Sequence, residues 1–374
     1  MLTIRSRFIT LACETRVGSP LDFQLKRVSA LKCIRALRFK RSGKSMRAYN
    51  KSMTQVSGKQ HDSQYTQSLP QSHTQQSNPI IPRVLSVAGT DPTGGAGIQA
   101  DLKSIMAAGG YGMCIPTNLV AQNTCEVREV FTPPVSFFRT QLSCVYDDVT
   151  VDALKIGMLG CAEYIESMRD WMRDNPVPVS VLDPVMISTS GKRLLEESAE
   201  KVMRKFISCV DVVTPNVPEL AALCKLPVAE NFEEACDQAR KLAAKNSVVV
   251  IVKGGHLTGE DVGNTAVFPD GYAQHVTSER VETSTTHGTG CSLSSALATK
   301  IGLALREGKN LSDHDTVMRA LKWSTAWLRE AIAAGSVLHV GRGSEGGDER
   351  GGVRGHGCGH GPVNHSVRIL KQTV

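Results

Sequence analysis

Hydrophobic positions in the middle of the chain fall into short apolar runs separated by longer stretches of helical length. From Arg83 onward these runs are rich in Val and Ile. Runs of this kind predict buried parallel strands, and the stretches between them predict crossover helices. The predicted strands are 84–88, 113–120, 153–157, 179–182, 211–213 and 247–252. The predicted helices are 98–108, 135–146, 161–173, 197–207, 217–224, 232–245, 289–305 and 313–334.

The order of these elements predicts an α/β fold with a mostly parallel central sheet and helices on both faces. A turn at Pro269-Asp270-Gly271 separates two further short runs, which predicts an antiparallel hairpin at the edge of the sheet. Ligands of open α/β sheets bind beyond the carboxyl ends of the strands, so the loops after each strand are the place to search for chemistry. No apolar run approaches the roughly 18–20 residues that cross a bilayer, and we expect no membrane partner.

Charge and composition set the two ends of the chain apart from its middle. The 374 residues carry a net charge of +7, of which residues 1–80 hold +11, while residues 81–340 hold −6. A domain that binds nucleic acid should carry its basic face on the domain itself, so we expect no nucleic-acid partner. Gln, Ser and Thr make up 16 of the 30 residues in 51–80, and such a segment buries too little apolar surface to fold. We therefore predict that residues 1–80 are disordered.

The first 50 residues leave the location of the protein open. They are Arg-rich and poor in acids, as organelle transit peptides are. We favour a start codon assigned too early, with Met46 or Met53 as the true start. Eleven cysteines without a C-x-x-C pair indicate a reducing compartment with mostly buried thiols. We expect a cytoplasmic location, and organelle targeting is the alternative if residues 1–50 form a real transit peptide.

Two glycine-rich loops are candidates for binding. The loop Gly89–Gly97 joins a predicted strand to a predicted helix, but it has neither the P-loop pattern nor G-x-G-x-x-G, and a structural role fits it as well as a binding role. The segment Thr285–Cys291 places two glycines at a helix start, where outward backbone N–H groups favour an anion. A cysteine at that position predicts a lowered pKa for Cys291, and a buried structural cysteine is the alternative.

Two other strand ends carry candidate charged residues. Asn216 can cap the next helix with Glu219 at its third position, which capping alone would explain. The functional alternative places Glu219 near a Mg²⁺ ion that bridges phosphates. Lys253 ends a predicted strand, where it either neutralises phosphate charge or is merely solvated. Together these features describe a phosphoryl-transfer site assembled from several strand ends, because that chemistry needs positioning and charge neutralisation above all.

At this point seven segments carry a resemblance to a known family. They are AGTDPTGGAGIQADLK (88–103), LVAQNT (119–124), KIGML (155–159), LDPVM (182–186), TPNVPE (214–219), VKGGH (252–256) and THGTGC (286–291). Together they resemble the hydroxymethylpyrimidine/phosphomethylpyrimidine kinases of thiamine biosynthesis, in the ribokinase-like superfamily. The resemblance covers about 82–343. It implies one ribokinase-like domain, usually a homodimer, that phosphorylates a hydroxymethylpyrimidine and then its monophosphate, with ATP and Mg²⁺ as cofactors.

The resemblance also implies roles for single residues. Gln122 matches the position that hydrogen-bonds the pyrimidine edge, which a carboxamide suits because it offers both a donor and an acceptor. The other implied substrate-binding residues are Asp101 near the same ring, Val185 and Met158 in the ring pocket, and Gly89 in the substrate loop. The implied anion hole is Gly288, Thr289, Gly290 and Cys291, with Cys291 either a general base or part of the hole. Lys253 matches a position near the transferring phosphate, and Asn216 and Glu219 match a Mg²⁺-linked pair.

The sequence departs from this family at both ends. Residues 1–80 have no counterpart. Near the C-terminus the family reads roughly Gly-x-Gly-x-Gly-Pro-x-x-His, whereas here Gly341-Arg342-Gly343 and His360–His365 are separated by residues 344–359. We therefore divide the chain into a tail (1–80), a kinase domain (81–343) and a Gly-rich insertion with a C-terminal tail (344–374). The run His356–His360 fits no tetrahedral zinc spacing.

Two alternative functions stay open at the level of sequence. One is a pyridoxal or pyridoxine kinase of the same superfamily, because its substrate also carries a hydroxymethyl group on a ring. The other is a protein that binds a pyrimidine without transferring phosphate.

Overall fold

The structure is a computed structural model that describes residues 79–186, 195–257, 259–341 and 360–370. The predictions for 1–78 and for 344–359 lie outside the described residues. No helix in the described part of the chain has the length and apolar character that a membrane span requires.

Eight strands of the described residues form one sheet in the order β10-β9-β8-β7-β6-β5-β1-β2. The six strands from β8 to β2 run parallel, and β9 and β10 complete the edge as an antiparallel hairpin. The strands are β1 (Arg83–Ala88), β2 (Tyr111–Pro116), β5 (Ala153–Ile156), β6 (Ser180–Leu182), β7 (Val212–Val213), β8 (Val249–Lys253), β9 (Asn264–Val267) and β10 (Ala273–Val276). The mostly parallel sheet and the edge hairpin confirm the fold expected from the sequence.

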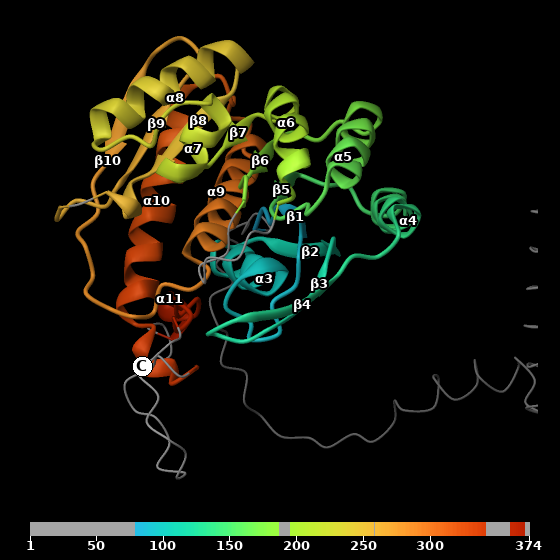
Figure 1. Cartoon of the computed structure of the whole chain (residues 1–374), viewed down its shortest axis with the longest axis horizontal. Coiled ribbons are helices and arrows are strands. Elements are labelled where there is room, and N and C mark those ends of the chain that lie inside the picture. Colours follow the sequence, from blue (N-terminus) through green and yellow to red (C-terminus); the bar gives the residue numbers. More distant parts are fainter. Residues whose placement is uncertain (1–78, 187–194, 258, 342–359, 371–374) are drawn as a thin grey trace, which may run out of the picture. The chain divides into compact units, whose positions relative to one another are not determined.

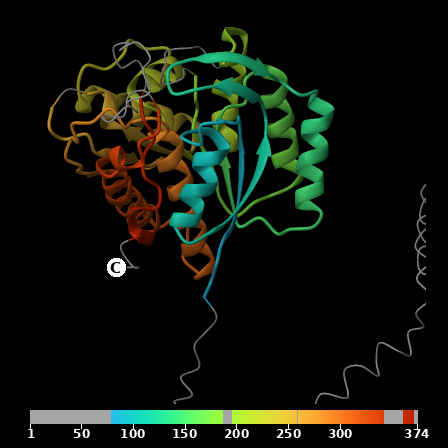
Figure 2. The same cartoon turned by 90° about the horizontal axis from the view of Figure 1, so that it is seen from below.

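Helices cover both faces of this sheet (Figure 1). One face carries α3 (Gly97–Ala107), α9 (Thr289–Arg306) and α10 (His314–Ala333). The other carries α4 (Val135–Tyr146), α5 (Ala162–Asp174), α6 (Glu197–Phe206), α7 (Val217–Cys224) and α8 (Phe232–Asn246). Figure 2 shows the orange α9 and red α10 on one side of the strands and the green α4 and α5 on the other. The short helices are η1 (Ile207–Cys209), η2 (Gly254–His256), η3 (Ser336–Leu338) and α11 (Val367–Leu370).

Successive strand residues supply two separate hydrophobic cores. In β8, Val250 and Val252 pack with α7 and α8, while Val249 and Ile251 pack with α9 and α10. The alternation follows from the two-residue period of a strand, whose side chains point to opposite faces in turn. A strand buried on both faces is mostly apolar, and the buried polar residues that remain, such as Ser86 in β1 and Lys155 in β5, have hydrogen-bond partners.

The predicted strand 113–120 is wrong as a single element. The structure ends β2 at Pro116 and begins β3 (Leu119–Gln122) in a separate two-stranded antiparallel sheet with β4 (Val127–Phe131). Thr117 and Asn118 form the break: the Thr117 N–H donates to Ala88 O, and Asn118 O accepts the Thr90 N–H, both at 2.9 Å. These two bonds turn the chain out of the main sheet and over the loop that follows β1.

Candidate active site

A cavity of about 700 Å³ opens at the carboxyl ends of the parallel strands. The loops after β1, β5, β6, β7 and β8 each contribute to its wall, as does the first turn of α9. Eleven of the residues expected from the sequence line it: Gly89, Gln122, Met158, Val185, Asn216, Glu219, Lys253, Gly288, Thr289, Gly290 and Cys291. The structure therefore brings together residues that are up to two hundred positions apart in the chain.

The loop after β1 is folded around a buried carboxylate, Asp91, which is 1% exposed. Its Oδ2 accepts the N–H groups of Gly95 at 3.1 Å and Ala96 at 2.7 Å. Its Oδ1 accepts both the N–H and the hydroxyl of Thr93, at 2.9 and 2.8 Å. Across the cavity wall, His287 Nε2 contacts Asp91 Oδ2 at 2.8 Å. Asp91 therefore shapes its own loop and attaches it to the loop that precedes α9.

The charge on Asp91 is stabilised by these donors. Burial alone would raise the pKa of Asp91, but hydrogen bonds from His287, Gln122 and Thr93 outweigh burial and hold that pKa well below its usual range. Gln122 matters for binding, because its carboxamide, expected to face the substrate ring, lies beside this anion and lines the cavity. The sequence analysis did not assign Asp91, although it lies inside the quoted loop.

The two glycine-rich loops touch through their backbones. Gly288 has a φ of +77°, and a Cβ atom at this position would lie 1.8 Å from the carbonyl oxygen of Gly95. Both the left-handed conformation and the close approach require glycine. The contact sets the first turn of α9 directly beside the loop after β1.

The first turn of α9 has the geometry that the expected anion site requires. Thr289, Gly290 and Cys291 are the first residues of the helix, so no carbonyl of the same helix accepts their N–H groups. All three residues line the cavity. A Cβ on Gly290 would lie 3.2 Å from Lys253 Nζ and 3.5 Å from Asp183 Oδ2. Positive charge and helix N-terminus therefore meet at one point of the cavity wall.

Lys253 lies between two carboxylates. Its Nζ is 2.8 Å from Asp183 Oδ1 and 3.6 Å from Glu219 Oε2. Burial opposes the charge on Lys253, but Asp183 and Glu219 outweigh it and raise the pKa of the lysine, so it stays protonated. Burial raises the pKa of Glu219 despite this cation. Asp183, 1% exposed, was not assigned from the sequence, although its position directly after β6 is the kind of strand end where such groups collect.

The predicted capping box at α7 is confirmed. Asn216 Oδ1 accepts the Glu219 N–H, and Glu219 Oε2 accepts the Asn216 N–H, both at 2.8 Å. Capping thus uses Asn216 Oδ1 and Glu219 Oε2 as acceptors. Among the described residues, no three His, Cys, Asp or Glu side chains cluster as a metal cage. Asp183 and Glu219 suit Mg²⁺, which typically takes one or two protein carboxylates and completes its shell with water and phosphate oxygens.

The expected lowering of the Cys291 pKa is wrong. Burial raises the pKa of the Cys291 thiol to about 11, and the carboxylates of Asp101 and Asp183 add to this shift. Lys155 and the Gly97 N–H act in the opposite direction but do not compensate. The position at a helix N-terminus does not lower this pKa, because the thiol is buried and carboxylates lie near it.

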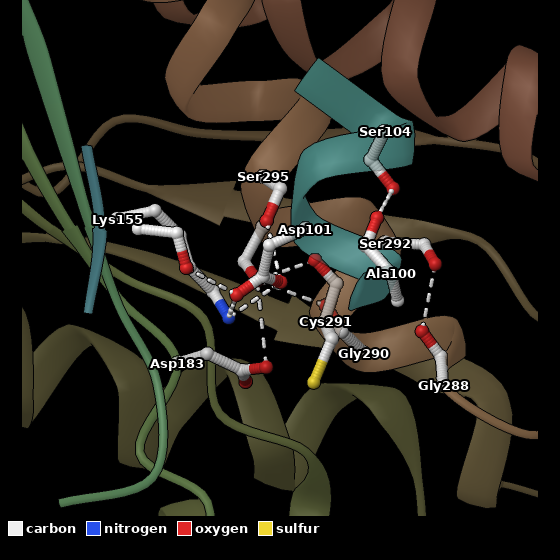
Figure 3. Close-up of polar contacts among 12 residues, drawn as sticks. Ala100, Asp101, Ser104, Lys155, Asp183, Gly288, Gly290, Cys291, Ser292 and Ser295 are labelled. Atoms are coloured by element: carbon white, nitrogen blue, oxygen red, sulfur yellow. Dashed lines mark hydrogen bonds and ion pairs between the residues drawn. The ribbon is translucent and has the colours of Figure 1, made fainter. Parts of the chain in front are cut away.

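Asp101 does not line the cavity, in contrast to the expectation that it contacts the substrate ring. It is fully buried on α3, and both its oxygens lie 2.8 Å from Lys155 Nζ. Ser86 and Ser295 donate to the same carboxylate at 2.6 and 2.8 Å. Figure 3 shows Lys155, Asp101 and Ser295 pointing toward one another behind Cys291. The pair is a buried connection between β5, α3 and α9.

The residues expected to form the ring pocket line the same cavity as Lys253. Met158 reaches it after β5, and its carbonyl accepts the Thr117 hydroxyl at 2.7 Å. A bulge between Ala121 and Gln122 interrupts the β3–β4 ladder where the carboxamide is presented. Sequence reasoning also missed the part of the cavity lined by apolar residues of the β9 and α10 region, because single apolar positions there carry no pattern. These residues are Val262, Val281, Leu328 and Ile332.

Comparison with known proteins gives the same assignment for most of the chain. The family model described as phosphomethylpyrimidine kinase matches residues 91–346. The thiamine biosynthesis multifunctional protein ThiED of Corynebacterium glutamicum is 53% identical over 296 residues, which are 79% of this chain and 35% of that protein. The chain thus spans about a third of the length of that relative.

Two further matches cover nearly the whole of the related protein. The hydroxymethylpyrimidine/phosphomethylpyrimidine kinase of Salmonella typhimurium is 42% identical over 260 residues, which are 69% of this chain and 94% of the relative. Among solved structures, an ADP complex of Bacillus subtilis pyridoxal kinase superposes with a TM-score of 0.62 at 26% identity, covering 78% of this chain and all of that one.

Proposed function

Because the chain belongs to the phosphomethylpyrimidine kinase family, we propose that it transfers the γ-phosphoryl group of ATP to 4-amino-5-hydroxymethyl-2-methylpyrimidine and then to its monophosphate, in thiamine biosynthesis. The observation that carries this proposal is a single cavity that holds both the ring-pocket residues and an anion site beside Lys253. Phosphoryl transfer depends on positioning and on neutralising charge, and this cavity offers groups for both.

Gln122 is the proposed reader of the pyrimidine edge. Its carboxamide lines the cavity and lies close enough to Asp91 to help lower the pKa of that carboxyl. The remaining amide donor and acceptor capacity can pair with an aminopyrimidine, which offers a ring nitrogen and an exocyclic amino group. Met158 and Val185 supply apolar contacts to the ring.

The proposed phosphate site combines Lys253 with the N–H groups at the start of α9. These fixed donors would hold ATP phosphates and stabilise the charge that develops as the phosphoryl group moves. Mg²⁺ would be held by Asp183 and Glu219, and when bound it would neutralise phosphate charge. Because the Cys291 thiol is protonated at neutral pH, we assign Cys291 to the anion hole through its backbone N–H rather than to proton abstraction.

The pyridoxal kinase alternative is favoured by one observation, the superposition with the solved pyridoxal kinase. The identity to that protein is 26%, against 42% to the pyrimidine kinase relative. The alternative of a protein that binds without catalysis is opposed by the charged Lys253 beside two carboxylates, an arrangement that serves phosphate chemistry.

The test is ADP release from the purified full chain with hydroxymethylpyrimidine, its monophosphate and pyridoxine as separate substrates, each with and without Mg²⁺. We expect turnover on both pyrimidines, loss of turnover without Mg²⁺, and little turnover on pyridoxine. Turnover on pyridoxine alone would replace the proposed function with the alternative, and calorimetric binding of the pyrimidine without any ADP release would favour a binding protein.

Gln122→Ala should raise KM for hydroxymethylpyrimidine about 10- to 100-fold with a smaller effect on kcat. The reason is that polar atoms of the bound ring would lose their partner inside the cavity, at a cost of about 1–3 kcal/mol. Steady-state kinetics with varied pyrimidine measure this. Met106→Ala is a matched control on an exposed surface position and should leave KM unchanged. An unchanged KM in Gln122→Ala would remove this residue from the substrate site.

Three statements about the whole chain stay proposals. We propose that residues 81–343 form the kinase domain together with the segment 360–370, which packs on α9 and α10, and that 344–359 is an insertion. We also propose that the protein is a homodimer and that it acts in the cytoplasm. Sedimentation velocity tests the second, and localisation of a C-terminally tagged chain tests the third.

A further inference from the structure

The chain returns to the anion site near its C-terminus. The His287 N–H donates to Gly361 O at 3.0 Å, and the Gly361 N–H donates to Ser284 O at 3.1 Å. Further along, the Asn364 N–H donates to Ala331 O, at the end of α10, at 2.9 Å. Residues 360–367 therefore hold the segment that precedes α9 from the side away from the cavity.

His365 is the residue of this segment that reaches α9. It is 5% exposed, and its Nε2 lies 2.9 Å from the hydroxyl of Ser292, which is fully buried. The Ser292 hydroxyl donates its single proton to Gly288 O at 2.8 Å. We assign the contact with His365 as Nε2–H to the serine oxygen, the tautomer that leaves the serine proton on Gly288 O. The three residues form one directed chain of hydrogen bonds, His365 to Ser292 to Gly288.

This chain fixes the orientation of one peptide unit of the anion site. Gly288 O receives both the Ser292 hydroxyl and the Ser292 N–H, the latter at 2.9 Å, and Figure 3 shows Ser292 bonded to Gly288. A trans peptide is planar, so the Thr289 N–H points opposite to the Gly288 carbonyl. Holding that carbonyl on the far side therefore keeps the Thr289 N–H directed the other way. Gly288 and Thr289 line the cavity, whereas Ser292 and His365 do not.

We propose that His365 is a positioning residue for phosphoryl transfer, which acts through Ser292 to keep the Gly288–Thr289 peptide aligned as an anion-site donor. The inference rests on the proposed function, because it assigns a role within that site. Burial lowers the pKa of His365 to about 4, with a contribution from Lys103, so the imidazole is neutral in the working range. The donor needed here is a neutral N–H, and the role requires no change of charge.

The test compares His365→Gln with His365→Met in the full chain. The two replacements have similar length, but only Gln retains an N–H donor at its end. We expect His365→Met to lower kcat about tenfold with KM for hydroxymethylpyrimidine changed less than twofold, because a donor misplaced toward the transition state costs rate rather than substrate affinity. His365→Gln should stay within about threefold of the parent kcat.

A double-mutant cycle separates positioning from general loosening. If His365 acts through Ser292, the variant carrying both His365→Met and Ser292→Ala should have a kcat no lower than that of the worse single variant. Asn364→Ala is the control in the same segment and should keep the parent kcat. Within the described residues, the Asn364 side chain makes one hydrogen bond, in which Oδ1 accepts the nearby Ser366 N–H at 3.0 Å. Thermal unfolding of each variant is recorded alongside.

Several outcomes would overturn the proposal. Equal losses in the Met and Gln variants, full activity in His365→Met, or additive losses in the cycle would each do so. If His365→Met fails to fold, Ser292→Ala alone should still give the tenfold loss of kcat, and its full activity would refute the chain. If the parent protein phosphorylates no pyrimidine, the proposed function fails on its own. Calorimetric affinity for a nonhydrolysable ATP analogue, expected to fall in His365→Met and not in His365→Gln, then decides the positioning role.

Discussion

Asp91 illustrates how one residue can organise two parts of an active site. A carboxylate buried in the loop after β1 gathers backbone donors from its own loop, a histidine from the loop before α9 and the carboxamide of Gln122. All of these donors favour the ionised form of Asp91 over the protonated form. The side chain proposed to read the substrate and the loop that precedes the proposed anion site therefore lie beside the same buried charge.

Asp91→Asn should destabilise the protein by about 2 kcal/mol, because one carboxylate oxygen becomes an amide that faces backbone donors. The folded-state pKa of Asp91 lies below the unfolded value, so its contribution is complete above the unfolded pKa and is lost as pH falls toward the folded value. In urea unfolding between pH 7 and pH 3, the free energy of unfolding should therefore fall less steeply toward acid pH in the variant than in the parent. Asp174→Asn, on the exposed end of α5, is the control. Parallel acid declines in parent and variant would contradict this account.

The Cys291 thiol should alkylate slowly at neutral pH. Only the thiolate reacts, and with a pKa of about 11 its fraction rises about tenfold for each pH unit between 7 and 10. Peptide mass spectrometry after timed iodoacetamide labelling measures this rate, with the exposed Cys209 as an internal reference. A rate that levels off below pH 9 would show instead that the helix N-terminus governs the thiol.

Residues whose partners are near in sequence were predictable, and those with distant partners were not. The Asn216–Glu219 box was predicted from a three-residue spacing, because a capping box is a local structure. Asp101 was misplaced because its partner Lys155 is 54 residues away, and nothing in either segment indicates the pairing. Asp183 and His365 were missed for the same reason, since their roles appear only when β6, α9 and the C-terminal segment meet.

At the level of elements, the parallel strands were predictable because burial on both faces leaves few polar positions in them, and Ser86 and Lys155 are among the exceptions. The β3–β4 sheet was not, because Thr117 and Asn118 break an apolar run that would read equally well as one strand. This small sheet delivers Gln122 and is attached to the rest of the site by the bond from Val120 N–H to Thr90 Oγ1, at 2.9 Å. Its position depends on tertiary contacts rather than on local periodicity.

Replacing residues 342–359 with a four-residue Gly-Ser linker should preserve the fold and the activity. Both ends of the excised stretch meet the same residue, because the His360 N–H donates to Thr124 O and a Cβ on Gly341 would touch the Thr124 side chain. Shortening this connection from 18 to four residues should stabilise the fold by about 1 kcal/mol, because a shorter connection costs less entropy to close. Denaturant unfolding and kcat measure the outcome.

A scrambled 342–359 segment is the control for that experiment, since it keeps length and composition. If the deletion abolishes turnover in a folded protein while the scramble retains it, the two anchor points need a longer connection than four residues. If both lose turnover, the sequence of 342–359 takes part in function and the interpretation of this stretch as an insertion is wrong.

At the scale of the whole molecule, the active site is built where the sheet, both helical layers and the returning C-terminal segment converge. Five strand ends and the first turn of α9 supply the residues that line the cavity, and these include the proposed binding groups and anion site. The sequence predicted this arrangement in outline, because loops at the carboxyl end of a parallel sheet share one edge. Which loops touch one another is set by close backbone contacts such as Gly288 on Gly95, which no periodic pattern encodes.

The distribution of charge yields a prediction for the entire chain. Residues 1–80 carry +11 and residues 81–340 carry −6, so the basic character of the protein lies outside the domain that holds the cavity. A chain that begins at Ser77 should keep kcat and both KM values within about twofold at 0.15 M salt, where charges beyond about 8 Å are screened. At low salt the full chain should show the lower KM for ATP, because a basic tail raises the local concentration of an anionic substrate. Chains that begin at Met46 and Met53 carry intermediate tail charges and should show intermediate KM values for ATP at low salt. A loss of kcat at 0.15 M salt in the chain that begins at Ser77 would show that the tail takes part in catalysis.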